Sequence, residues 1–134
     1  MSMPMFPDTL RSEFVKFTNA DGTATKSFPT CAAKGGIAVT LRAAGNLIET
    51  RIITVLRYDG NAEHLICSGD LPAAAAGRVS NVTLLHPTTL HDLDPNNIQE
   101  FIGGGHQIRV RLNTAVPSGA FEVSVQVNYG EYPT

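Results

Sequence analysis

Residues 121–129, Phe-Glu-Val-Ser-Val-Gln-Val-Asn-Tyr, alternate strictly between apolar and polar side chains. Successive side chains of a β-strand point to opposite faces, so this stretch predicts a strand with one buried and one wet face. Residues 107–113 repeat the alternation, and Val116-Pro117-Ser118-Gly119 between the two stretches favours a hairpin-like turn. The side chains that we expect in the core are Ile108, Val110, Leu112, Phe121, Val123, Val125 and Val127.

Six further stretches read as strands. In the longest of them the even-numbered positions are the more apolar, but Ile53 and Val55 are apolar too, so we expect its middle to be covered on both faces. Asp21-Gly22 and Asp59-Gly60 are turn signals of the hairpin type between neighbouring strands. Eight strands with turns at this spacing predict an all-β fold, an antiparallel β-sandwich or jelly roll. The six stretches are residues 13–18, 23–28, 37–42, 47–58, 64–68 and 79–85.

One segment departs from the strand pattern and predicts a short helix over residues 95–102. Asp94 is a suitable N-cap, Pro95 suits the first helical position, and Gly103 suits the position after the end. We expect the apolar side of this helix, which includes Ile102, to close one end of the sandwich.

The domain organisation that we expect is a single β-sandwich over residues 8–134 with an arm at residues 1–7. Pro4 and Pro7 remove backbone donors and favour an extended arm that stays out of a central strand. Exposed apolar side chains on this arm are unfavourable in a lone monomer, which indicates partner binding; a frayed terminus is the alternative. The candidate partner-binding residues of the arm are Met3, Met5 and Phe6.

Charged residues make up only 16% of the chain, below the roughly 25% of soluble domains. Seven of the ten basic residues are Arg, and interfaces are enriched in Arg and depleted in Lys and Glu; a GC-rich genome is the alternative explanation. Arg109 and Arg111 share one strand face, which makes them candidates for binding an acidic protein partner. The alternative is a solvated face paired with Glu49 or Glu122. A net charge of −2 and a pI near 6.0 argue against nucleic-acid binding.

No spacing of residues compels a chemistry. His86, His91, Asp92 and Asp94 could ligate a metal, but in a loop their spacing gives them no common face. Calcium binding of the EF-hand type fails because Gly103 stands where a carboxylate is needed. The chain has no P-loop and no Gly-x-Ser-x-Gly elbow. We therefore expect no catalytic residue, no metal, no cofactor and no enzyme activity.

Compartment follows from three further observations. The first residues lack the charged region and long apolar run of a signal peptide, and no stretch reaches the ~20 apolar residues of a membrane span. Cys31 and Cys67 lack metal or redox spacing; we expect two thiols, with a disulfide as the alternative. We expect a chain that is made in a cytoplasm and binds no membrane.

With these traits the chain resembles the small jelly-roll decoration (cement) proteins that coat the heads of tailed phages. The resemblance covers the whole length: the size, eight expected strands, few lysines, the apolar arm, and uncharged polar strand faces such as Ser124, Gln126 and Asn128. It implies a non-catalytic virion protein on the capsid surface, which binds the capsid lattice or copies of itself as a homo-oligomer and stabilises the shell. The alternatives are a lectin-like or other ligand-binding module, with its site in end loops 86–97 or 103–106, and a small β-sandwich enzyme.

Overall fold

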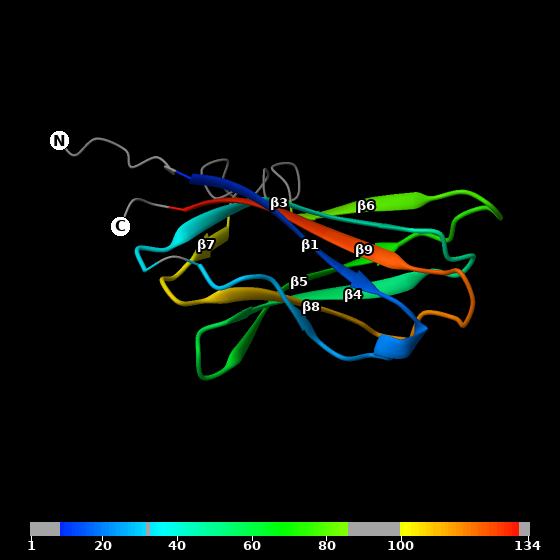
Figure 1. Ribbon diagram of the computed structural model, residues 1–134, viewed down its shortest axis with the longest axis horizontal. Coiled ribbons are helices and arrows are strands. Elements are labelled where there is room, and N and C mark those ends of the chain that lie inside the picture. The colour runs from blue at the N-terminus through cyan, green and yellow to red at the C-terminus, as the bar shows by residue number, and fades with distance from the viewer. Residues whose placement is uncertain (1–8, 32, 86–99, 132–134) are drawn as a thin grey trace.

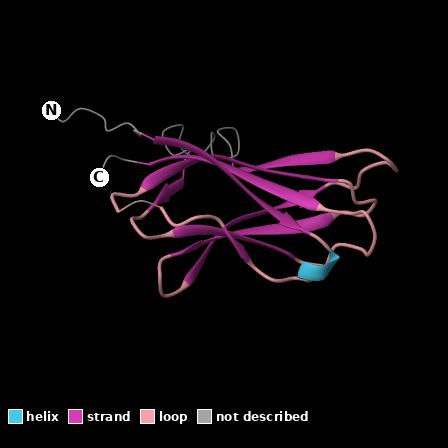
Figure 2. Cartoon of the chain, in the orientation of Figure 1, coloured by secondary structure: helices cyan, strands magenta, loops and turns pink. Residues whose placement is uncertain are grey.

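Two stacked β-sheets make up the chain, as the computed structural model shows for residues 9–31, 33–85 and 100–131 (Figure 1). Within these ranges the one helical element is the single 3-10 turn η1 (Asn19–Asp21), and Figure 2 shows strands joined by loops everywhere else. The strands are β1 (Thr9–Phe17), β2 (Lys26–Ser27), β3 (Gly36–Gly45), β4 (Arg51–Tyr58), β5 (Glu63–Leu71), β6 (Ser80–Leu85), β7 (Glu100–Ile102), β8 (Gln107–Leu112) and β9 (Val123–Glu131).

The strand order is that of a jelly roll. One sheet has the order β1-β9-β3-β6, with β7 also paired to β3, and the other has the order β2-β8-β4-β5. Strands of the first half thus pair with strands of the second half in reverse order: β1 with β9, β2 with β8, β3 with β6, and β4 with β5. This nested arrangement is the eight-stranded jelly roll. The predicted all-β sandwich is confirmed, and β7 is a short additional strand.

Two of the expected hairpins are wrong. The segment around Val116-Pro117 links β8 to β9, and the segment around Asp21-Gly22 links β1 to β2, but both pairs of strands lie in different sheets. These links cross from one sheet to the other. Each sheet has one apolar face, and the apolar faces of the two sheets pack against each other to form one core. Val116 itself has no exposed surface and packs in that core.

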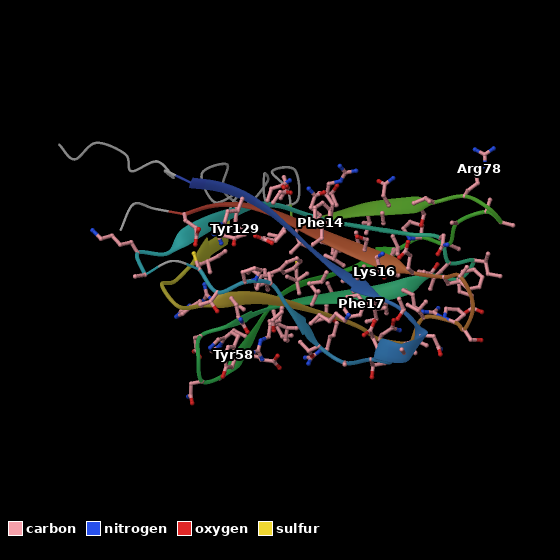
Figure 3. All side chains as sticks on the ribbon, viewed as in Figure 1. Phe14, Lys16, Phe17, Tyr58, Arg78 and Tyr129 are labelled. Atoms are coloured by element: carbon pink, nitrogen blue, oxygen red, sulfur yellow. The ribbon has the colours of Figure 1, made fainter. Side chains whose placement is uncertain are left out.

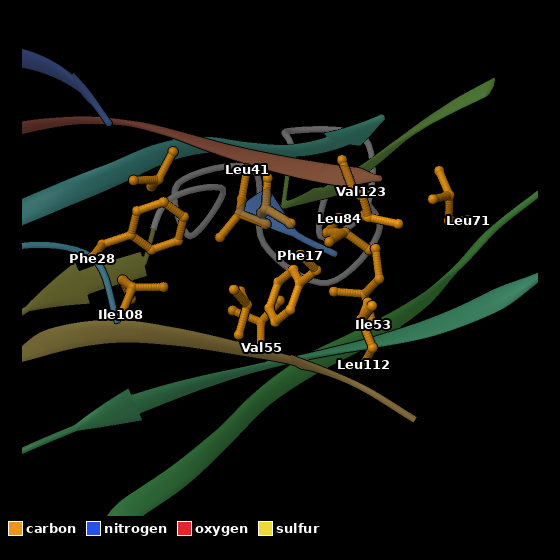
Figure 4. Packing of buried hydrophobic residues seen from close by; sticks show 14 of the residues in the cluster. Phe17, Phe28, Leu41, Ile53, Val55, Leu71, Leu84, Ile108, Leu112 and Val123 are labelled. Carbon is orange, nitrogen blue, oxygen red and sulfur yellow. The ribbon is translucent and has the colours of Figure 1, made fainter. Parts of the chain in front are cut away.

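The core lies between the sheets, and Figure 4 shows its side chains interleaving from both. The predicted core residues of β8 and β9 are buried as expected, and the one exception is Phe121, which is only half-buried at the margin. Phe17 of β1 is fully buried near the centre (Figure 4). The central strand β9 contributes most regularly, because Val123, Val125 and Val127 all point inward between β1 and β3.

In β4 the odd-numbered positions face the core, although the even-numbered positions carry more apolar side chains. Ile53 and Val55 are fully buried in the core, whereas Ile52 is 42% exposed on the outer side. Leu56 is also buried, although it pairs with Arg109 on the outward side of β8. The expectation that the middle of this strand is covered on both faces is therefore confirmed at Leu56.

The helix expected over residues 95–102 is wrong where the structure describes it. Residues 100–102 form β7, antiparallel to residues 36–38 of β3, and residues 95–99 lie outside the described ranges. Local signals favoured a helix, but the backbone groups of β7 bond to β3 instead, and tertiary pairing outweighs weak local propensity. Ile102 is nevertheless buried in the core, at the end of the sandwich where the helix was expected to close it.

The β4–β5 hairpin forms around Asp59-Gly60 as predicted. The Asp59 carboxylate accepts the backbone N–H groups of Asn61 and Ala62, both at 2.8 Å, and lies 2.7 Å from His64 Nε2. The bond from Ala62, then His64, then the bond from Asn61 lower the pKa of Asp59 below its ordinary value. Gly60 follows with a φ of 94°, which glycine adopts without strain.

Replacing this carboxylate should make the stability of the hairpin less dependent on pH. Because its pKa is lower when folded, Asp59 stabilises the fold fully above its ordinary pKa of about 4, and the effect fades as the pH falls toward the folded value. We expect Asp59→Asn to melt below the wild type at pH 7, and the gap to narrow in acid below about pH 4. Melting curves of both proteins across this range test it; a gap independent of pH would contradict the assignment.

Candidate functional site: the outer face of the β1–β9–β3–β6 sheet

The outer face of this sheet carries side chains in three rows that cross the strands. One row runs from Ser12 through Asn128 to Thr40, as the strand register places them opposite one another. The next row joins Phe14, Gln126, Arg42 and Thr83, and the third joins Lys16, Ser124, Ala44 and Asn81. These rows follow from the even-odd alternation, because the odd-numbered neighbours on β9 and β3 face the core.

Uncharged polar groups in the first two rows bond to one another. Ser12 Oγ donates to Asn128 Oδ1 at 2.8 Å, and Gln126 Nε2 donates to Ser12 Oγ at 2.7 Å. Asn128 Nδ2 in turn donates to Thr40 Oγ1 at 2.9 Å, so the network spans β1, β9 and β3. Side chains held in place this way lose little conformational freedom when a partner binds.

Charge on this face is sparse. Lys16 forms an ion pair with Glu122 at 3.0 Å, and both side chains are well exposed, so the pair contributes little to stability. Arg42 is exposed and makes no hydrogen bond or ion pair within the described part of the chain. Phe14 is 63% exposed in the middle of the edge strand β1 (Figure 3), which leaves a large aromatic ring in water.

Two shallow hollows of about 160 Å³ each lie on this face and share Ala44 and Ser124. These two residues are cross-strand partners. Because their side chains are small, they form the bottom of the hollows between the larger side chains around them. Phe14 lines the first hollow, and Val79, 68% exposed, lines the second. Hollows of this size are below the roughly 300 Å³ of small-molecule sites but suit side chains of a protein partner.

A third hollow of about 410 Å³ continues from the second, with which it shares Asn46 and Val79, into the end loops. Ile48 and Phe121 line it, and Arg78 stands at the far end of the molecule (Figure 3). We call the three adjoining hollows together the trough. The trough therefore runs from the edge strand β1 to the loops that join β3 to β4, β5 to β6 and β8 to β9.

The loops around this hollow lie at the opposite end of the sandwich from loop 103–106, one of the two end loops that the sequence favoured as a ligand site (Figure 1). Loop 103–106 is packed against neighbouring backbone: Cys31 N donates to His106 O at 2.8 Å, and Gly105 N donates to Cys31 O at 3.1 Å. A Cβ atom on Gly104 would lie 1.9 Å from the Ala33 carbonyl oxygen, so this position requires glycine. Loop 86–97 lies outside the described residues.

The predicted pair Arg109 and Arg111 lies together on the outer face of the other sheet, and both residues have partners within the chain. The Glu63 carboxylate forms ion pairs with both arginines, at 3.4 Å from Arg109 and 3.6 Å from Arg111. Arg109 also donates to Gln107 Oε1 at 2.8 Å and stacks 3.6 Å above the ring of Tyr58. These contacts match the solvated-face alternative, with Glu63 in the place expected for Glu49 or Glu122. A partner for this pair outside the chain stays a prediction.

A third polar cluster joins the two strands at the start and end of the described chain. Arg11 Nε lies 3.0 Å from Glu131 Oε1, whose residue is 7% exposed, and Arg11 also donates to Tyr129 Oη at 3.5 Å. The hydrogen bond to Tyr129 and then the charge of Glu131 raise the pKa of Arg11, and burial raises the pKa of Tyr129. The cluster clamps β1 to β9 and offers no open site.

The other candidate site residues from the sequence lie outside the described part of the chain. Met3, Met5 and Phe6 lie outside the described ranges, as do His86, His91, Asp92 and Asp94. Within those ranges no three His, Cys, Asp or Glu side chains gather as metal ligands would, and no helix is long and apolar enough to cross a membrane. Cys31 is buried and Cys67 half-buried, and both are thiols.

Comparison with known proteins finds no matching family model and no matching curated protein. Among solved structures the chain is similar to one in the structure of the infectious bursal disease virus Gx strain, with 8% identity and a TM-score of 0.33. The match covers 96% of this chain and 38% of that one, so this chain spans well under half of that protein. It is also similar to a chain in the cryo-EM structure of the giant freshwater prawn Macrobrachium rosenbergii extra small virus VLP, with 11% identity, a TM-score of 0.32 and coverage of 99% and 88%. TM-scores this low carry no argument about function.

Sequence reasoning missed Phe14 and the trough. A signal for Phe14 was present, because Phe14, Val15 and Phe17 place apolar side chains on both faces of one short strand. The trough had no such signal, since its floor of Ala44 and Ser124 depends on the pairing of β3 with β9.

Proposed function

We propose that this chain is a non-catalytic structural protein of a virion, which binds the outer surface of a phage capsid shell and stabilises it. The outer face of the β1–β9–β3–β6 sheet is the surface that makes the contact. The jelly-roll strand order and the decoration-protein traits of the sequence support this proposal.

The observation that carries the proposal is the trough in an almost uncharged, internally hydrogen-bonded face. Most of this face loses little hydration when it docks, because Lys16 already has Glu122 and the amide groups already have one another. Arg42, which lines the first hollow, is the charged group that a partner surface would have to pair. Phe14 and Val79 stand exposed at two points along the trough, where a partner surface would cover them. Aromatic residues such as Phe14 are enriched in the buried core of protein interfaces.

A charge placed in the trough should abolish shell binding without unfolding the protein. Ala44→Arg adds a long cation to the floor shared by two of the hollows, and its side chain faces solvent, so the melting temperature should move little. The measurement is co-sedimentation of the protein with purified capsid shells of the phage that encodes it. We expect a loss of binding of about 100-fold or more, the effect of losing roughly 3 kcal/mol.

The matched control is Ser68→Arg, an exposed position on β5 in the other sheet, which should bind as the wild type does. Deleting residues 2–7 should also weaken binding while leaving the melt unchanged, if the arm contributes to assembly. Equal binding by Ala44→Arg and the wild type would contradict the proposed surface, and absence of wild-type binding would contradict the proposed function.

A ligand-binding β-sandwich module is the second candidate, and the 410 Å³ hollow favours it. Its size falls within the range of small-molecule sites, and it combines the apolar Ile48 and Phe121 with the guanidinium of Arg78. A ligand there would be apolar with one anionic group. Chemical shifts of residues around the hollow, titrated with a short-chain fatty acid, would separate this candidate from the first.

A further inference from the structure

Among the described strands, β1 pairs only with β9, so its other edge is available for pairing with another chain. It lies at the edge of its sheet and pairs with β9 over its whole length, Thr9 to Phe17, without a bulge. This stretch contains no proline or glycine. Proteins usually protect a long edge strand with such devices, because its unpaired N–H and C=O groups attract another strand.

Two contacts identify the residues of β1 whose backbone groups face this open edge. In a strand, one residue directs both its N–H and its C=O group to one side, and the next residue directs both to the other side. The Ser12 and Asn128 side chains bond directly, as in the closer, non-hydrogen-bonded pairs of an antiparallel ladder. The ammonium group of Lys26, from the other sheet, donates a hydrogen bond to the Lys16 carbonyl oxygen. This carbonyl therefore points away from β9. The even-numbered residues thus face outward, and Lys26 closes this edge at Lys16.

We propose that two copies of this chain join through β1, antiparallel about a two-fold axis at Ser12. In this register Ser12 faces Ser12 of the second copy, and Leu10 faces Phe14. The pairing forms about six backbone hydrogen bonds, two for each facing pair, and uses only edge groups that Lys26 leaves open. Two sheets become one continuous sheet through the centre of a symmetric dimer.

The side chains of β1 fit this register. Phe14, 63% exposed in the single chain, lies at the junction between the two copies, which takes part of its aromatic ring out of water. Arg11 faces Glu13 of the second copy, and Glu13 makes no hydrogen bond or ion pair within the described part of its own chain. The dimer therefore brings Arg11 and Glu13 together on one side of the sheet and covers Phe14 on the other.

Neighbouring registers are less favourable. An axis at Glu13 places two carboxylates directly opposite each other, which is destabilising. An axis at Phe14 needs the Lys16 carbonyl, which Lys26 already occupies. The Ser12 axis avoids both conflicts. The backbone pairing uses the edge of the sheet, and the dimer also covers Phe14, which lines the first hollow of the trough. The dimer is therefore tested on the free protein, whereas shell binding is tested by Ala44→Arg.

Cysteine cross-linking tests both the pairing and its register. In the Ser12→Cys variant the two new thiols meet across the axis, where facing Cα atoms are about 5.5 Å apart and within disulfide reach. Phe14→Cys is the matched control on the same strand and face. Its two thiols would be about 14 Å apart, four residues at 3.4 Å each, too far for a disulfide. The wild type, with its buried Cys31 and half-buried Cys67, sets the background.

Under mild oxidation we expect Ser12→Cys to form a covalent dimer and Phe14→Cys to stay at background. The uncross-linked wild type should sediment at a mass near twice 14.3 kDa, and Ser12→Pro, which removes the central edge N–H, should sediment as one chain. Cross-linking through Phe14→Cys alone would overturn the Ser12 register. A wild type that stays monomeric at high concentration, with Ser12→Cys at background, would overturn the dimer. Shell binding by the wild type and by Ala44→Arg reports separately on the proposed function, because Ser12 and Phe14 lie on the proposed shell-binding face.

Discussion

Val125→Asp should leave the chain largely unfolded at 25 °C. Val125 has no exposed surface and lies in the central strand β9, between Val15 of β1 and Ala43 of β3. The substitution removes about 2 kcal/mol of apolar burial and places a carboxylate where no partner can reach it, at a cost of several kcal/mol more. A domain of this size is stable by only about 5–15 kcal/mol in total.

Circular dichroism in the far ultraviolet and a urea melt measure this effect. Ser124→Asp is the matched control, because the neighbouring residue points to the outer face opposite Lys16 and should change stability by about 0.5 kcal/mol or less. A Val125→Asp protein that melts cooperatively near the wild-type temperature would show that β9 does not direct Val125 into the core.

Phe17→Ala should destabilise the fold by about 3–5 kcal/mol, the range for removing a buried phenylalanine. Phe17 is fully buried near the centre of the core (Figure 4). The ammonium group of Lys26 lies 5.5 Å from its ring centroid. Truncation leaves a cavity, because Phe17 belongs to the β1–β9 ladder and the backbone around it can relax only partly. We expect the melting temperature to fall by about 10–20 °C.

Phe14→Ala is the control for this variant, with the same chemistry on the same strand and the opposite face. Phe14 is mostly exposed, so in a monomer its loss should cost about 0.5 kcal/mol or less. If β1 also forms the dimer, Phe14→Ala should weaken association while Phe17→Ala should chiefly lower the melting temperature. Equal destabilisation by both variants would contradict the orientation of β1.

Strand positions could be predicted because alternation is a local property, and all eight predicted stretches contain a strand. The inward face of β4 could not be predicted, since Ile52 and Ile53 are equally apolar and only the register with β8 distinguishes them. The same limit applies to β7, whose strand state depends on pairing with β3, far away in the sequence. Turn signals marked the ends of strands but not whether the chain stays in one sheet or crosses to the other.

Less of the candidate site could be predicted. The polar residues Ser124, Gln126 and Asn128 were recognised as one face of a strand, but their neighbours Ser12 and Thr40 are more than 80 residues away in the sequence. Proximity of that kind comes only from strand order. The pairing of Glu63 with both Arg109 and Arg111 was missed for the same reason, because it joins β5 to β8 across β4.

The position of β9 has a consequence for how the chain folds as it is synthesised. β9 is the last strand of the described chain, yet it lies between β1 and β3 and pairs with both. Until it leaves the ribosome, β1 and β3 have no common partner, and half of the sandwich has no central strand. The β4–β5 hairpin can form early because its contacts are local, whereas closing the first sheet must wait until β9 has been synthesised. We therefore expect slow, late folding, during which the nascent apolar strands need protection from aggregation.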